Sequence, residues 1–212
     1  MDITWYGHSC FRLTERGSTS IVTDPFDPGV GYGALNLKAQ VVTISHEAAG
    51  HAHVDAVRDW EYVINRPGEY EIGGVFIIGT PMFNKKADDP KPNIVYSFDY
   101  SGVIVVHLGD LDHVPSQSAL ESLGEVAVLL VPVGGGGALN ASQAAEVVSL
   151  IEPAIVVPMH YKTPHTQLEL AGVEKFLAEM GVTSPTEEET LKVSTSGLPA
   201  QTQVTLLSYK QG

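Results

Sequence analysis

Short apolar runs separated by turn residues dominate the first half of the chain. Runs rich in Val, Ile, Tyr and Phe, bounded by Gly, Pro or Asp, are typical of β-strands. The expected strands are Ile3–Tyr6, Cys10–Leu13, Ser20–Thr23, Val41–Ser45, Tyr62–Ile64, Glu69–Ile72, Val75–Gly79, Ile94–Asp99 and Val103–Leu108. Gly73-Gly74 predicts a hairpin turn. The segment Phe83–Pro92, with Lys85-Lys86 and Asp88-Asp89, predicts a polar surface loop.

Helical and strand patterns alternate in the second half. The expected helices are Ser116–Leu123 and Asn140–Ile151, each with its first residue as N-cap, and Gln167–Met180. The expected strands are Val126–Val133, Ile155–Pro158, Thr190–Ser194 and Gln203–Ser208. No repeat or linker interrupts the sequence, so we expect one domain over residues 1–212. Two mixed sheets covered by helices accommodate this order, which indicates the α/β class.

Composition and charge narrow the class of protein. The 212 residues are 43% hydrophobic and 17% charged, which is enough apolar material for one sizeable core. The balance of 12 basic and 25 acidic residues gives a formal net charge of −13, which argues against non-specific nucleic-acid or membrane binding. Cys10 is the single cysteine, so no intrachain disulfide forms, and a reducing, cytoplasmic location fits. We expect neither a signal peptide nor a transmembrane helix.

Imidazole and carboxylate groups follow several of the expected strands. His8 lies in a tight turn between the first two strands, and His46 follows Val41–Ser45. Asp110 follows Val103–Leu108, and His160 follows Ile155–Pro158. Several such donors on a rigid scaffold, converging at strand ends, are what a Zn²⁺, Fe²⁺ or Mn²⁺ site requires. A shared metal centre would explain all of these positions together.

Ordered motifs surround these residues. They are Gly7-His8-Ser9-Cys10-Phe11, Thr23-Asp24-Pro25-Phe26, Pro67-Gly68-Glu69-Tyr70-Glu71, Leu108-Gly109-Asp110-Leu111, Pro132-Val133-Gly134-Gly135 and Pro158-Met159-His160-Tyr161. Together they resemble a branch of small metal-dependent hydrolases of the metallo-β-lactamase superfamily, similar in outline to the ascorbate-6-phosphate lactonases. The resemblance implies an αββα sandwich of two mixed β-sheets flanked by helices, with a metal site at one edge between the sheets.

The loop after Val41–Ser45 is a degenerate form of the superfamily's His-x-His-x-Asp-His motif. In a gapless alignment His46 and His51 match the outer histidines, whereas Ala48 and Gly50 stand in place of the second histidine and the aspartate. The first metal site of the family is therefore expected to be empty or weak. A second register, His51-Ala52-His53-Val54-Asp55, also reads His-x-His-x-Asp and remains open.

The resemblance implies a ligand set for the second metal site. It consists of His51, Asp110 and His160, with His8 as a fourth ligand or hydrogen-bond partner and His46 as a remnant of the first site. We expect at most one divalent metal per chain, zinc first, with manganese, iron or nickel as alternatives, or none if the site has decayed.

Further residues have weaker assignments. Asp24 either orients a ligand histidine or forms a turn, and in the gapless register His53 lies near the mouth of the site. His113 is a candidate acid or base beside Asp110, and Lys162 either meets an anionic substrate group or is solvated. His107, inside an apolar strand, is expected to be structural.

Two functions follow from this pattern. The first is a metal-dependent hydrolase that acts on a small-molecule ester, lactone or phosphoester. The alternative is a catalytically inactive, metal-free binding or scaffold protein. Neither a membrane nor a nucleic-acid partner is expected, and a homo-oligomer remains open.

Overall fold

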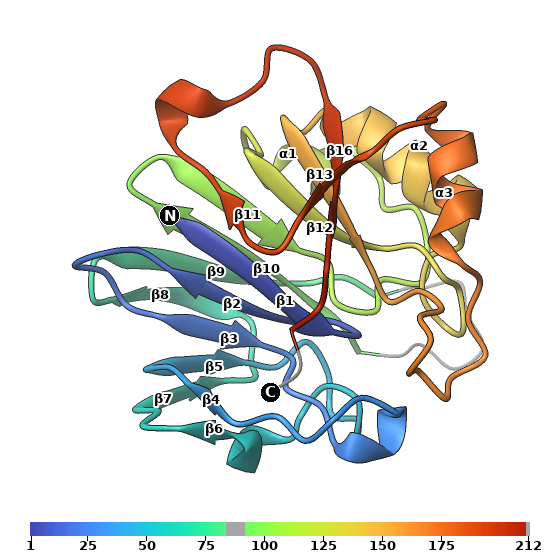
Figure 1. Cartoon of the computed structure of the whole chain (residues 1–212). Helices are drawn as coiled ribbons and strands as arrows, with labels where there is room; N and C mark the ends of the chain where they lie inside the picture. Colours follow the sequence, from blue (N-terminus) through green and yellow to red (C-terminus); the bar gives the residue numbers. More distant parts are fainter. Residues whose placement is uncertain (84–91, 211–212) are drawn as a thin grey trace.

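Two β-sheets stacked face to face form the body of the protein (Figure 1). The computed structural model describes residues 1–83 and 92–210, so most of the expected loop Phe83–Pro92 lies outside the described residues. Aromatic and aliphatic side chains from both sheets, among them Trp5, Phe11, Tyr96 and Phe98, fill the space between the sheets. This arrangement confirms the α/β class and the pair of mixed sheets.

The six-stranded sheet has the order β15-β1-β2-β3-β5-β7. Its strands are β1 Asp2–Gly7, β2 Cys10–Thr14, β3 Ile21–Thr23, β5 Val41–Thr43, β7 Tyr62–Ile64 and β15 Leu191–Lys192. Strands β1, β2 and β3 are antiparallel neighbours, whereas β3, β5 and β7 are parallel. The carboxyl ends of these parallel strands therefore lie at one edge of the sheet.

The eight-stranded sheet has the order β14-β16-β13-β12-β11-β10-β9-β8. Its strands are β8 Gly68–Ile72, β9 Val75–Pro81, β10 Ile94–Tyr100, β11 Val103–His107, β12 Val128–Pro132, β13 Ile155–Met159, β14 Thr186–Glu188 and β16 Gln203–Leu207. Strands β11, β12, β13 and β16 are parallel. The hairpin at Gly73 and Gly74 is confirmed, since φ is 54° and 78°, the left-handed backbone that a tight two-residue turn requires. Strand β14 was not predicted.

Among the described residues, three α-helices gather beside the eight-stranded sheet, where α2 packs on β12 (Figure 1). They are α1 Gln117–Glu121, α2 Ala141–Ile151 and α3 Val173–Glu179. Asn140 caps α2 as predicted, and its side chain and that of Gln143 form a reciprocal capping box.

The predicted start of the last helix at Gln167 is wrong. Leu168 and Leu170 lie in an irregular loop because Ala171 donates its N–H to Gly134 O at 2.9 Å, and the helix begins only after Gly172.

The outer face of the six-stranded sheet is covered without an α-helix among the described residues. A second apolar cluster there joins Cys10, Val22 and Val42 to Phe26 and Tyr32 from the following loop. Its other elements are the 3-10 turns Pro28–Val30 and Val54–Ala56 and the short pair β4 Leu37–Lys38 and β6 Val57–Arg58. No described helix is long and apolar enough to cross a membrane.

Candidate metal centre

Strand ends from both sheets bring polar residues to one edge of the sandwich. Asp24 follows β3, His46 follows β5, Asp110 follows β11 and His160 follows β13. The turn between β1 and β2 carries His8 to the same place, where His160 N donates to His8 O at 3.1 Å. Parallel pairing places these strand ends together, so residues far apart in sequence become neighbours.

The backbone is strained at this edge. His8, Asp24 and His160 have φ values of 49°, 41° and 50°, in the left-handed region that non-glycine residues rarely adopt. Each such conformation costs on the order of 1 kcal/mol. They are three of the six described non-glycine residues with positive φ. Strain is therefore concentrated where the polar side chains converge.

His51 lies at the centre of the group and is only 2% exposed. Its Nδ1 is 2.9 Å from Asp24 Oδ2. The Asp24 carboxylate also accepts from Ser45 N at 2.7 Å and Ser45 Oγ at 2.6 Å. Burial raises the pKa of Asp24, but the charge and hydrogen bond of His51 outweigh burial and lower the pKa below its ordinary value. The carboxylate is therefore ionised and cannot donate a hydrogen bond. His51 Nδ1 must therefore carry the proton, which leaves Nε2 to face the interior of the site.

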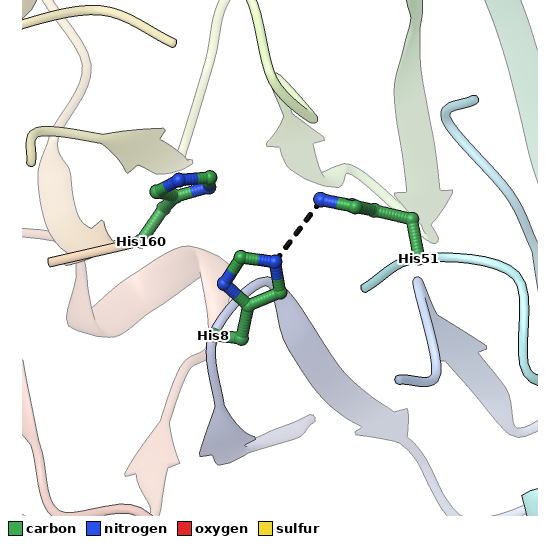
Figure 2. Close-up of side chains that lie close together, drawn as sticks. All are labelled: His8, His51 and His160. Carbon is green, nitrogen blue, oxygen red and sulfur yellow. Dashed lines mark hydrogen bonds between the residues drawn. The ribbon is translucent and has the colours of Figure 1, made fainter. Parts of the chain in front are cut away.

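Four side chains surround the space that His51 Nε2 faces. Figure 2 shows the rings of His8, His51 and His160 turned toward one another, with His8 Nε2 3.1 Å from His51 Nε2. The Asp110 carboxylate closes the group, with Oδ2 3.2 Å from His51 Nε2 and Oδ1 2.7 Å from His160 Nδ1. Asp110 Oδ1 and His160 Nδ1 are buried, yet neither has a hydrogen-bond partner among the described atoms. Both atoms are thus close but not aligned on each other.

The site is built around one positive charge. Burial lowers the pKa of His51, but the carboxylates of Asp110 and Asp24 outweigh it and raise that pKa to about 10. Burial and the charges of His51 and His160 hold the pKa of His8 well below its usual range. Burial raises the pKa of Asp110, but His51 and His160 lower it well below the usual range. A proton on His51 offsets one of the two carboxylate charges, of buried Asp24 and partly buried Asp110, and a divalent metal ion would offset both.

The donor set fits a divalent transition metal. Two groups, His8/His51/His160 and His46/His51/Asp110, each place their ligand atoms within 4.8 Å of one another. Together they offer four imidazoles, from His8, His46, His51 and His160, and one carboxylate, from Asp110. Such donors are typical for Zn²⁺ and its neighbours. The carboxylate–histidine pair of Asp24 and His51 is the usual arrangement behind a ligand histidine. A bound ion would give the unpartnered atoms of Asp110 and His160 a partner.

Gly50 and His8 are complementary. A Cβ atom at Gly50 would lie 2.8 Å from His8 Nε2, closer than real Cβ contacts come. The aspartate that the superfamily places at this position would therefore displace His8. An imidazole from the first turn of the chain fills the space that the loop leaves.

Asn93 is a supporting residue that the sequence did not reveal. Its buried amide donates to Leu108 O at 3.0 Å, and its Oδ1 accepts from Asp110 N at 3.0 Å. It thereby fixes both ends of the turn that presents Asp110. Gly109 in this turn has φ of 59°, and a side chain there would collide with Asn93 Oδ1. Asparagine before a strand is a common turn residue, so no local pattern marks this role.

His107 ties two of the ligand-bearing turns together. Its Nε2 is 2.9 Å from Ser9 O, and its Nδ1 accepts from Gly109 N at 3.2 Å. Since a carbonyl only accepts, Nε2 carries the proton. The buried ring links the turn of His8 to the turn of Asp110, in agreement with a structural role.

His46 and His113 lie differently from the buried group. His46 is at the rim, with Nε2 3.9 Å from Asp110 Oδ2. Ser45 Oγ donates its proton to Asp24, so His46 Nδ1, 3.1 Å from that oxygen, is the donor and Nε2 holds a lone pair. His113 pairs with Asp112 at 2.8 Å and is not among the residues that line the cavity over the site.

The donor groups bear on the choice between the two registers of the loop. His51 belongs to both groups and His46 to one of them. His53 and Asp55, which the second register would use, belong to neither group, and Asp55 is exposed. This placement favours the gapless register. The Lys162 ammonium donates to the carbonyls of Thr166 and Leu168 at 2.8 and 3.3 Å. Binding of an anionic substrate group by Lys162 stays a prediction.

Comparison with known proteins identifies the family of the chain. A profile of the family described as Beta-lactamase superfamily domain matches residues 2–160, about three quarters of the chain. The chain belongs to the β-lactamase superfamily. The resemblance inferred from the motifs is thereby confirmed.

Individual relatives extend the match. A UPF0173 protein of Pyrococcus furiosus is 31% identical over 183 residues, which cover 77% of this chain and 84% of the relative. A UPF0173 metal-dependent hydrolase of Methanoculleus marisnigri is 28% identical over 188 residues, covering 77% and 82%. The crystal structure of a Thermotoga maritima protein, assigned to the Zn-dependent hydrolases of the metallo-β-lactamase superfamily, is 37% identical and covers 99% of both chains with a TM-score of 0.81.

Proposed function

We propose that this superfamily member is a metal-dependent hydrolase with one divalent ion per chain, held by His8, His51, His160 and Asp110. One observation carries the proposal. Asp24 accepts the Nδ1 proton of His51, so His51 Nε2 faces a carboxylate oxygen 3.2 Å away and a second imidazole nitrogen 3.1 Å away. A cation at Nε2 would satisfy these groups, and a divalent ion would also match the negative charges of Asp24 and Asp110. Zinc is the first candidate, and manganese, iron and nickel accept the same donors.

Each side chain has a defined task in this proposal. When bound, the ion supplies Lewis acidity to a carbonyl or phosphoryl oxygen and makes water more acidic. Asp24 and Ser45 hold His51 in the tautomer that offers Nε2. Burial, followed by the charge of His51, lowers the pKa of His46, so its rim nitrogen is a lone pair able to accept a proton from water. His46 is therefore the favoured base, and His113 remains a second candidate.

The metal-free alternative also rests on a specific observation. With its pKa raised to about 10, His51 holds a proton between Asp24 and Asp110 and offsets one of their two charges without a metal. A protein that keeps this state permanently would act as a binding or scaffold protein. We place either form in the cytoplasm with a small-molecule ligand, because Cys10 is a free, buried thiol and the formal net charge is −13.

Thermal melting separates the two functions. After chelator treatment, added Zn²⁺ at about a hundred times its Kd should stabilise the wild type by about 2.7 kcal/mol through mass action. His8→Ala and His160→Ala should lose that response, while His53→Ala, the matched control, keeps it. Elemental analysis should find one ion per chain, and the loaded protein should hydrolyse a para-nitrophenyl ester or phosphodiester. A wild type indifferent to every divalent ion establishes the metal-free alternative.

A further inference from the structure

The candidate ligands line one side of a cavity of about 700 Å³. This donor group consists of His8, His46, His51, Asp110 and His160. Two loops and a turn contribute most of the other lining residues: residues 46–51 after β5, here called the histidine loop, the loop before α3 and the 3-10 turn Pro28–Val30. The lining side chains apart from the donors and glycines are Asp27, Val30, Ala48, Ala49, Leu168, Glu169 and Leu170. This volume accommodates a small organic molecule.

One wall is apolar and fixed in place. Leu168 and Leu170 come from the segment whose periodicity predicted a helix, and both are half-buried. The Leu170 side chain packs against Gly136, where a Cβ would collide with it, and Ala171 N donates to Gly134 O at 2.9 Å. Leucines held in this way present a preformed apolar surface to the cavity.

The histidine loop adds to the apolar surface. Ala48 stands where the superfamily motif has a second histidine, and it lines the cavity together with Ala49. A methyl group thus replaces an imidazole over the donor group. The loss of one ligand leaves room for substrate at the position of the first metal site.

Charge in the cavity does not favour an anion. With one divalent ion and neutral histidines, the carboxylates of Asp24 and Asp110 offset the charge of the ion. Asp27 and Glu169 then make the mouth negative, and no lysine or arginine is among the described lining residues. A phosphodiester arrives with a negative charge and gains another in the transition state. A carboxylic ester arrives neutral and develops only one charge.

We propose that the cavity takes an uncharged carboxylic ester or lactone whose acyl chain lies against Leu168, Leu170 and Ala48. This inference rests on the proposed hydrolase function and specifies its substrate class. The oxygen of water forms the new bond to the acyl carbon while His46 Nε2 takes its proton. The bond between the acyl carbon and the alkoxy oxygen breaks, and the alkoxide receives that proton from His46. The products are a carboxylic acid and an alcohol.

A substrate series tests the class directly. Zinc-loaded full-length protein is assayed with para-nitrophenyl acetate, butyrate and hexanoate, and with bis(para-nitrophenyl) phosphate. We expect kcat/KM to rise about threefold to fourfold for each methylene buried against the leucines. The acceleration over the uncatalysed reaction should be larger for the esters than for the phosphodiester. A flat chain-length series or a preference for the phosphodiester overturns the inference and leaves the hydrolase function intact.

Matched variants locate the recognition. Leu170→Asn should flatten the chain-length series, whereas Leu150→Asn, an exposed leucine of α2 outside the cavity, should leave it unchanged. Glu169→Lys should raise phosphodiester hydrolysis relative to ester hydrolysis, whereas Glu179→Lys should not. Unchanged ratios in the Leu170 and Glu169 variants contradict the inference.

A binding measurement is independent of turnover. Titration of zinc-loaded protein with hexanamide, a neutral analogue of the acyl group, should shift the backbone amide resonances of Ala48 and Leu170. Binding should be weaker in Leu170→Asn. If loaded protein hydrolyses neither substrate class, the proposed function is wrong. If hexanamide also leaves these resonances in place, the apolar site is wrong as well.

Discussion

Metal binding at this site has to displace a proton from His51. The carboxylates of Asp24 and Asp110 raise the pKa of His51 to about 10 in the metal-free protein, and its Nδ1 proton is retained by Asp24 in both states. The proton that leaves is therefore the one on Nε2. At pH 7 the proton on Nε2 must be removed about three units below the pKa of His51. This removal weakens metal binding by about 4 kcal/mol relative to the deprotonated site. The sign is fixed: metal affinity rises with pH until His51 has lost its proton.

Calorimetric titration measures both consequences. Zn²⁺ binding to chelator-treated protein, measured in buffers of different ionisation enthalpy, should release about one proton per ion near neutral pH. The apparent Kd should fall about tenfold for each pH unit through the mildly alkaline range. Asp24→Asn removes one of the two charges that raise the pKa, so its affinity should level off at lower pH. An affinity independent of pH, or binding without proton release, would refute the assignment of His51 Nε2 as ligand.

Three further predictions concern single features. Gly50→Asp should weaken zinc binding although it adds a carboxylate, because the new side chain displaces His8. The control Gly33→Asp places its side chain in open space and should leave zinc binding unchanged. Stronger zinc binding in Gly50→Asp would refute the idea that His8 takes the place of the missing aspartate. Asn93→Ala should destabilise the fold by about 2 kcal/mol through two lost hydrogen bonds and should also raise the zinc Kd, which a titration of folded protein detects. In metal-free protein, the stability gained from the raised pKa of His51 is fully present below pH 6.5 and is lost as pH rises through about 10. The melting temperature of metal-free protein should therefore fall at alkaline pH, and bound zinc should abolish this fall.

Local sequence signals predicted the elements whose stability is local. Gly73 and Gly74 form the expected turn because the left-handed backbone is easiest for glycine, and Asn140 caps α2 through contacts within one helical turn. The same holds for the apolar strands, since alternation and β-branched residues are read within a few positions. The order of the motifs then identified the superfamily and the residues of the donor group.

Long-range contacts decided what the sequence could not predict. The periodicity that starts at Leu168 predicts a helix from Gln167, but a backbone hydrogen bond from Ala171 to Gly134 holds this segment as a cavity wall. The complementarity of Gly50 and His8 joins positions on different loops, so in the sequence the glycine appears only as a missing ligand. Asn93 acts through two backbone groups that lie beyond the adjacent strands, and no spacing rule reports such a contact.

Anomalous diffraction from zinc-loaded crystals tests the central claim most directly. The account predicts one peak per chain, within bonding distance of His8 Nε2, His51 Nε2, His160 Nδ1 and the Asp110 carboxylate. Two peaks, a peak that excludes His8, or an empty site in crystals grown with excess zinc would contradict it.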